Sequence, residues 1–245
     1  MTETVASASV TVPASKSFAA RIVGVVVSPR ATYADVAAHP RWLGALAVVL
    51  IVSVAGLFTL MSTDVGKRAM IDQQTRAMES FGVKLTEKMR ADMDAGMARA
   101  PYVTAASQLV VLPIMTLIIA GILFGVFSAV MGGDAKFKQV FAIVAHAGIV
   151  TAAGQIFVLP LDYVRESLSS PTTLAAFVPM LDENSFPVRL LGSIDLVVVW
   201  WLISLAIGLG VLYKRKTAPI ATTFLTIYIA IGLIVAIAKT ALAGA

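Results

Sequence analysis

The chain has 245 residues, of which 58% are hydrophobic and only 13% are charged. Soluble domains carry about 25% charged residues, so this composition excludes an ordinary soluble protein and indicates a polytopic membrane protein. The absence of cysteine excludes disulfides, thiolate metal sites and a cysteine nucleophile. The net charge of +5 is interpreted as a topology signal rather than as nucleic-acid binding, because the basic residues cluster between apolar segments.

The region before the first long apolar segment divides into two parts. Residues 1–16 are rich in Ser, Thr and Ala without periodicity, which predicts a disordered tail. Residues 17–41 contain an apolar run from Phe18 to Val27 and a second short helix, expected from about Thr32 to Ala38 and ended by His39-Pro40. We interpret these pieces either as amphipathic helices in the lipid headgroup layer or as a simple tether before the membrane.

Residues 42–245 form the predicted membrane domain. A helix needs roughly 20 apolar residues to cross a hydrocarbon core of about 30 Å. Five segments meet this requirement, at about 42–61, 105–131, 140–161, 192–213 and 218–241. The sequence therefore predicts an all-α bundle of five transmembrane helices. The second segment contains Gly121-x-x-x-Gly125, a small-residue ridge suited to close contact with a neighbouring helix.

One hydrophilic segment, residues 64–99, separates the first two spans. We expect two amphipathic helices with a break near Gly82. In the second helix the apolar residues fall within an arc of about 120°, at about 100° per residue, and the charged residues lie outside it. We call these apolar residues the Met stripe: Leu85, Met89, Met93 and Met97. Thioethers can bind Cu(I), but no His or Cys lies nearby, so we predict no metal and expect the Met stripe to contact a partner, the membrane surface or this chain.

The distribution of Lys and Arg predicts the orientation. The N-terminal segment and the two short turns after the second and fourth spans carry nine basic and three acidic residues, whereas the other side carries ten basic and eleven acidic residues. Short basic turns mark the cytoplasmic face. We therefore expect a cytoplasmic N-terminus, an extracytoplasmic C-terminus and an extracytoplasmic 64–99 segment.

Three groups of residues resemble prokaryotic members of the Yip (Ypt-interacting protein) domain family over roughly residues 18–240. They are Ser28-Pro29 with Tyr33-x-Asp35 and His39-Pro40-x-Trp42; Gly132-Gly133 with Phe137-Lys138-Gln139-Val140 and Ala145-His146-Ala147; and Ile194-Asp195-Leu196 with Trp200, Leu202 and Ile207-Gly208-Leu209. The resemblance implies five membrane helices and a cytoplasmic N-terminus. Eukaryotic relatives bind Rab-type GTPases, a role that does not transfer to a bacterial cell. Two features depart from the family pattern. His146 stands where the family usually has an aromatic or small residue, and the 64–99 segment is an addition.

Polar residues inside the predicted spans are the candidate site residues, because burying them in the bilayer is unfavourable. Asp195 either caps its helix or forms a polar site shared with a neighbouring span. Gln155 is expected at a similar depth, and Gln108 and Arg189 are expected in the same leaflet. His146 lies deeper and is interpreted as a packing residue more readily than as a ligand or proton relay.

Two functional hypotheses follow. No nucleophile elbow, zinc-protease motif or phosphate-binding loop is present, so we expect no enzymatic activity and no cofactor. The first hypothesis is a membrane scaffold or adaptor in the bacterial inner membrane that binds a protein partner or a second copy of itself, in contact with membrane lipids and not with nucleic acid. The second is a transporter or lipid-handling protein with a polar site around Asp195 and Gln155.

Overall fold

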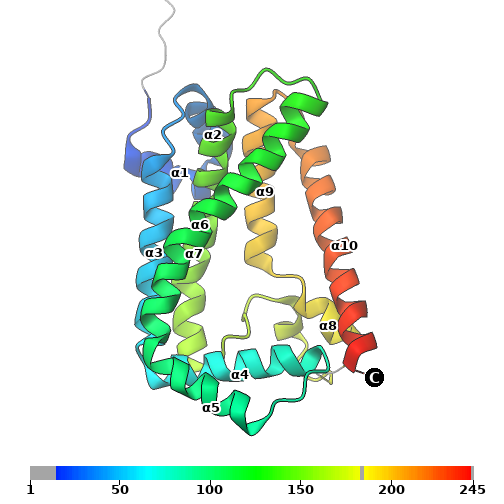
Figure 1. Cartoon of the computed structure of the whole chain (residues 1–245). Coiled ribbons are helices and arrows are strands. Elements are labelled where there is room, and N and C mark those ends of the chain that lie inside the picture. Colours follow the sequence, from blue (N-terminus) through cyan, green and yellow to red (C-terminus); the bar gives the residue numbers. More distant parts are fainter. Residues whose placement is uncertain (1–14, 183–184, 244–245) are drawn as a thin grey trace, which may run out of the picture.

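The computed structural model describes residues 15–182 and 185–243, which in those ranges are helical apart from connecting turns and loops. The long helices are α3 (Leu43–Met61), α6 (Ala100–Phe124), α7 (Phe137–Val164), α9 (Leu196–Leu212) and α10 (Thr217–Ala243). They form a bundle, in which one helix, α6, crosses obliquely in front of its neighbours (Figure 1). A π-helical segment, η2 (Gly125–Val130), extends α6.

Four of these helical stretches are long and apolar enough to cross a membrane: those containing α3, α6 with η2, α7 and α10. The fourth predicted span, at about 192–213, is shorter than expected. α9 has 17 residues, which cover about 26 Å and reach only the lower limit for a crossing helix. The predicted start at residue 192 is wrong, because Ser193 to Asp195 form a turn that separates α9 from a short helix, α8 (Phe186–Gly192). That α9 crosses the membrane stays a prediction.

Two short helices, α1 (Phe18–Val27) and α2 (Pro29–Ala38), precede the bundle as predicted. Their packing was not indicated by the sequence. α2 lies against α7 and α9, and the side chains of Tyr33 and Val36 are fully buried. The Tyr33 hydroxyl hydrogen-bonds to Ser204 Oγ on α9 at 2.7 Å. Burial raises the pKa of the Tyr33 phenol above its usual value, so this hydroxyl stays protonated.

The core is centred on α7, whose small residues let neighbouring helices approach closely. A Cβ added at Gly154 would lie 2.5 Å from Val197 on α9, and one added at Gly208 would lie 2.5 Å from Ile143 on α7. The Gly121-x-x-x-Gly125 ridge differs, because an added Cβ at either glycine would meet nothing within 4 Å. The expectation that this ridge packs on a neighbouring helix is therefore wrong within the described chain.

The remaining elements lie at the end of the bundle opposite α1 and α2 (Figure 1). α4 (Asp64–Ser80) crosses this end, a turn at Phe81-Gly82 follows, and α5 (Glu87–Gly96) leads through a 3-10 turn, η1 (Met97–Arg99), into α6. Gly82 has φ +77°, which confirms the predicted break between the two hydrophilic helices. A second 3-10 turn, η3 (Leu174–Phe177), packs beside α8.

Candidate functional site

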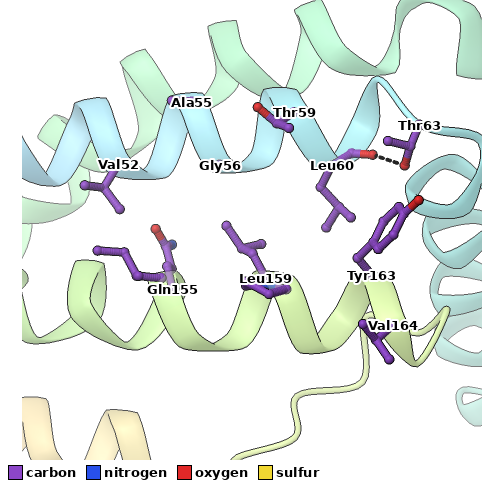
Figure 2. Close-up of a pocket in the computed structure, with 12 residues that line it drawn as sticks. Val52, Ala55, Gly56, Thr59, Leu60, Thr63, Gln155, Leu159, Tyr163 and Val164 are labelled. Atoms are coloured by element: carbon purple, nitrogen blue, oxygen red, sulfur yellow. Dashed lines mark hydrogen bonds between the residues drawn. The ribbon is translucent and has the colours of Figure 1, made fainter.

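A groove of about 670 Å³ lies between α3 and α7. Figure 2 shows side chains of the two helices facing one another, with Gln155 and Leu159 directed from α7 toward α3. The lining is mainly apolar, with polar groups from Thr59, Thr63, Gln155 and Tyr163. Gly56 has no side chain and so leaves room for Leu159, because a Cβ added at Gly56 would clash with the Cδ1 atom of Leu159. The groove therefore has the size and apolar character of a site for a hydrocarbon chain.

Two polar groups face this groove. Ser53 Oγ donates to Gln155 Oε1 at 2.7 Å, while the Gln155 amide nitrogen has no hydrogen-bond partner among the described residues. Pro160 lies inside α7 and lacks an N–H, so it cannot donate the usual helical hydrogen bond to the carbonyl of Ile156. Gln155, Ile156 and Pro160 all line the groove. The arrangement offers one amide donor and one carbonyl acceptor beside an apolar surface.

Asp195 is the N-cap of α9. Its Oδ1 atom accepts from the backbone N–H of Val197 at 2.8 Å and of Val198 at 3.4 Å. The backbone at Asp195 is extended (φ −102°, ψ 127°), as an N-cap requires. The carboxylate therefore accepts hydrogen bonds from backbone N–H groups at the start of α9 that have no acceptor within the helix. Its negative charge also interacts favourably with the positive end of the helix dipole.

The other carboxylate oxygen ties the loop before α8 to α9. Oδ2 accepts from Ser170 Oγ at 2.6 Å and from Thr172 Oγ1 at 2.8 Å. An antiparallel bridge joins Thr173 to Asp195. On α10, Tyr228 accepts from the Asp195 N–H at 2.9 Å and donates to the Ser193 carbonyl at 2.9 Å. We call Ser170, Thr172, Asp195 and Tyr228 the Asp195 cluster. Its hydrogen bonds hold three chain segments together.

The other predicted polar residues do not join this cluster. Arg189 Nη1 donates to the Lys239 carbonyl near the end of α10 at 2.6 Å. His146 is buried on α7, and its Nδ1–H donates to the Ala142 carbonyl one turn earlier at 2.7 Å. Gln108 is half-buried on α6 and makes no hydrogen bond to the other candidates. Among the described residues, no hydrogen bond joins these side chains to Asp195, and a polar site shared by Asp195 and Gln155 stays a prediction.

A comparison with protein families shows which family the chain belongs to. A model of the Yip1 domain matches residues 23–238, which is most of the chain. The chain belongs to the Yip1 domain family. Curated proteins and solved structures gave no match. The match to the Yip1 domain covers the groove, the Asp195 cluster and all of the long helices except the end of α10.

The Met stripe of this Yip1-domain protein lies on α5 and its flanks, as the periodicity predicted. Leu85, Met89, Met93 and Met97 are half-buried, while the other residues from 81 to 99 are exposed. No residue of α5 is fully buried. The predicted apolar face of α5 is therefore present, and the rest of the helix is exposed.

Sequence reasoning missed a buried ion pair between α1 and α2. Arg21 Nε lies 2.6 Å from Asp35 Oδ2, with the two side chains 3% and 11% exposed. Arg21 Nη1 also donates to the His39 carbonyl at 3.0 Å, and the Lys16 N–H donates to Asp35 Oδ1 at 3.1 Å. An arginine inside the apolar run from Phe18 to Val27 was the available signal, because such a charge needs a partner when its helix packs.

The hydroxyl partners of Asp195 were also missed. Ser170 and Thr172 belong to a run of four hydroxyl residues and a proline, Ser169-Ser170-Pro171-Thr172-Thr173, which resembles any polar loop. Among the described residues no group of three His, Asp or Glu side chains is arranged to hold a metal ion. The Yip1 domain here thus offers a hydrogen-bonded clamp at Asp195, a lateral apolar groove and a half-buried Met stripe on an otherwise exposed helix.

Proposed function

We propose that this Yip1-domain protein is a non-enzymatic membrane scaffold that binds a protein partner through the Met stripe. The observation that carries the proposal is the contrast between the interior and α5. Asp195, His146 and Arg189 all make hydrogen bonds within the chain, so their polar groups serve the fold. The Met stripe is the apolar surface that lies on an otherwise exposed helix.

The charge of α5 favours a protein over the membrane surface as the occupant. Helices that lie on membranes are rich in Lys and Arg on the polar face. Between Glu87 and Gly96 the chain instead has two basic and three acidic residues. Methionine adapts its shape to different surfaces and makes favourable contacts with aromatic rings, as protein-binding surfaces require.

The test compares two double variants of the full-length protein, purified from its own cells in mild detergent. Met89→Gln/Met93→Gln removes the apolar stripe, and Lys88→Gln/Asp92→Asn changes the same number of residues on α5 outside the stripe. We expect a stoichiometric partner, identified by mass spectrometry, to be lost only with the methionine variant. Equal binding by both variants would refute the proposal, as would the absence of any stoichiometric protein partner from the wild-type preparation.

We further infer five spans with a cytoplasmic N-terminus, in the inner membrane of a bacterium. The distribution of basic residues supports the orientation. Arg30 is on α2, Lys136 and Lys138 are at the start of α7, and residues 214–216 join α9 to α10. These parts of the chain lie at the end of the bundle that carries α1 and α2 (Figure 1). Because the chain has no cysteine, single cysteines report topology directly. Asp134→Cys and Ala91→Cys place thiols at opposite ends, and we expect an impermeant maleimide to label only Ala91→Cys in intact cells.

A second candidate function is lipid handling in the α3–α7 groove. The specific observation is a Gln155 amide nitrogen without a partner among the described residues and an Ile156 carbonyl that Pro160 cannot pair with, beside an apolar cavity of about 670 Å³. Ala55→Trp fills the groove from an exposed position, and Ile118→Trp is a control on the exposed surface of α6. If the groove binds lipid, one lipid class co-purifies with wild type and Ile118→Trp and is lost with Ala55→Trp. An unchanged lipid profile rejects this function.

A further inference from the structure

A second cavity, of about 660 Å³, lies at the end of the bundle that carries α2. It is formed where α2 meets the turn between α9 and α10. We call it the basic pocket; its charged lining residues are Arg30, Lys214, Arg215 and Lys216. No acidic residue lines it, and Gly210 on α9 and Ala34 on α2 form part of its wall.

The positive charge of the basic pocket is not neutralised within the described chain. None of its four cationic side chains makes an ion pair with a described residue. The acidic residue of α2, Asp35, is already bound to Arg21 and to the Lys16 N–H. The one polar contact of these side chains is from Arg215 Nη2 to the Met131 carbonyl, at 3.5 Å. Four like charges around one cavity repel each other, so an anion there is favoured.

The backbone holds Lys214 in an unusual conformation. Its φ is +52°, in the left-handed region where a helix end normally has glycine. The Arg215 N–H donates to the Gly210 carbonyl at 2.8 Å and the Lys214 N–H donates to the Val211 carbonyl at 3.3 Å, which is the Schellman arrangement. A glycine at this position would close the helix with less strain. The chain keeps a lysine where the fold alone would favour glycine.

The position of the basic pocket indicates which kind of anion reaches it. It lies at the last turn of α9 and the first turn of α10, where an apolar helix that can cross the membrane begins. The positive-inside rule assigns this end to the cytoplasm, where the inner leaflet presents anionic headgroups. Basic pockets between membrane helices on that side are suited to phosphate headgroups.

We propose that the basic pocket binds the phosphate group of an anionic phospholipid from the cytoplasmic leaflet. Arg30 and the 214–216 turn contact the phosphate from two sides, and the acyl chains lie along the outer surface of α10. This site is separate from the α3–α7 groove and from the Met stripe. Its test therefore does not depend on the proposed protein partner.

The test titrates the full-length protein in a neutral detergent with phosphatidylglycerol, phosphatidylcholine, or inorganic phosphate, and measures the apparent Tm. Lys214→Gln/Lys216→Gln removes two charges from the basic pocket. Lys136→Gln/Lys138→Gln is the matched control, because it removes two exposed charges at the same end that do not line the cavity. For wild type we expect a half-saturating phosphatidylglycerol concentration about tenfold below that of phosphatidylcholine, a preference lost only in the pocket variant.

A third variant separates binding from folding. Lys214→Gly relieves the left-handed backbone, so we expect it to have an apparent Tm at least equal to wild type while its preference for phosphatidylglycerol falls. Equal loss in the Lys136→Gln/Lys138→Gln control would overturn the proposal, because the effect would be one of general charge. A shift with inorganic phosphate and none with phosphatidylglycerol would also overturn it, since the ligand would then be a soluble phosphate.

Discussion

Replacing Asp195 tests whether this residue is a structural clamp or part of a working polar site. Asp195→Ala removes the N-cap of α9, worth about 1 kcal/mol. It also removes two hydroxyl-to-carboxylate hydrogen bonds, from Ser170 and Thr172, each worth about 1.5–3 kcal/mol. These two hydroxyls lie 2.9 Å apart and can pair with each other, which lowers the loss. We expect a net destabilisation of about 3 kcal/mol.

Asp195→Asn is the informative comparison. Asparagine caps a helix about as well as aspartate, and its amide can still pair with the two hydroxyls, so we expect a cost of about 1 kcal/mol. Unfolding in mixed micelles of increasing denaturing detergent, followed by tryptophan fluorescence, measures the difference, because Trp200 and Trp201 lie on α9 itself. Asp134→Ala, which removes an exposed carboxylate, is the control and should stay within about 0.5 kcal/mol of wild type.

Two results would refute the clamp. A loss below about 1 kcal/mol for Asp195→Ala would mean that the hydrogen bonds contribute little. Equal losses for the alanine and asparagine variants would mean that the negative charge, and not the hydrogen-bonding shape, is what α9 requires. An ionisable functional site has a different signature, in which Asp195→Asn keeps its stability and loses a transport or lipid phenotype.

Three further predictions concern packing and charge. Asp35→Ala leaves the buried Arg21 without its partner and should destabilise the protein by about 3–5 kcal/mol, whereas Arg21→Met/Asp35→Leu should recover most of this loss, as measured by the same unfolding assay. Gly208→Ala places a Cβ 2.5 Å from Ile143 and should lower the free energy of unfolding by about 1–3 kcal/mol. Gly121→Ala, whose Cβ meets nothing within 4 Å, should be neutral or stabilising. Equal effects of the two substitutions would contradict the helix packing. Lys214→Gly should stabilise the protein by about 1 kcal/mol in lipid-free detergent, and a destabilisation would show that the left-handed turn is not strained.

Regular features of the fold were predictable because local sequence encodes them. The bounds of α1 and α3 follow from runs of apolar residues ended by polar or proline-containing turns, and the break at Gly82 follows from the residue type that left-handed backbone requires. The Met stripe was predictable for a similar reason, since the spacing of Leu85, Met89, Met93 and Met97 places them on one face of any helix they form. Membership of the Yip domain family was likewise visible in short groups of residues and is confirmed over residues 23–238.

The partners of polar residues were not predictable, because they are set by contacts between segments far apart in the chain. Asp195 was expected either to cap its helix or to share a polar site with a neighbouring span, and it does cap α9. Its further hydrogen bonds, with Ser170, Thr172 and Tyr228, were not expected, and Gln155 pairs with Ser53. A depth estimate from helix rise gives a height in the membrane but not which face of each helix points inward. Rotation of a helix by a few residues changes every neighbour.

The sequence by itself determined that this protein is an all-helical, apolar membrane protein, which helices it forms and where its positive charges gather. Those properties depend on composition and on periodicity within single segments. The tertiary structure alone decided that α2 packs on α7 and α9, that Arg21 and Asp35 form a buried ion pair, and that Arg30 joins residues 214–216 around one cavity. Each of these joins segments that are separated in the chain, and only the packing of side chains, which no single segment contains, brings them together.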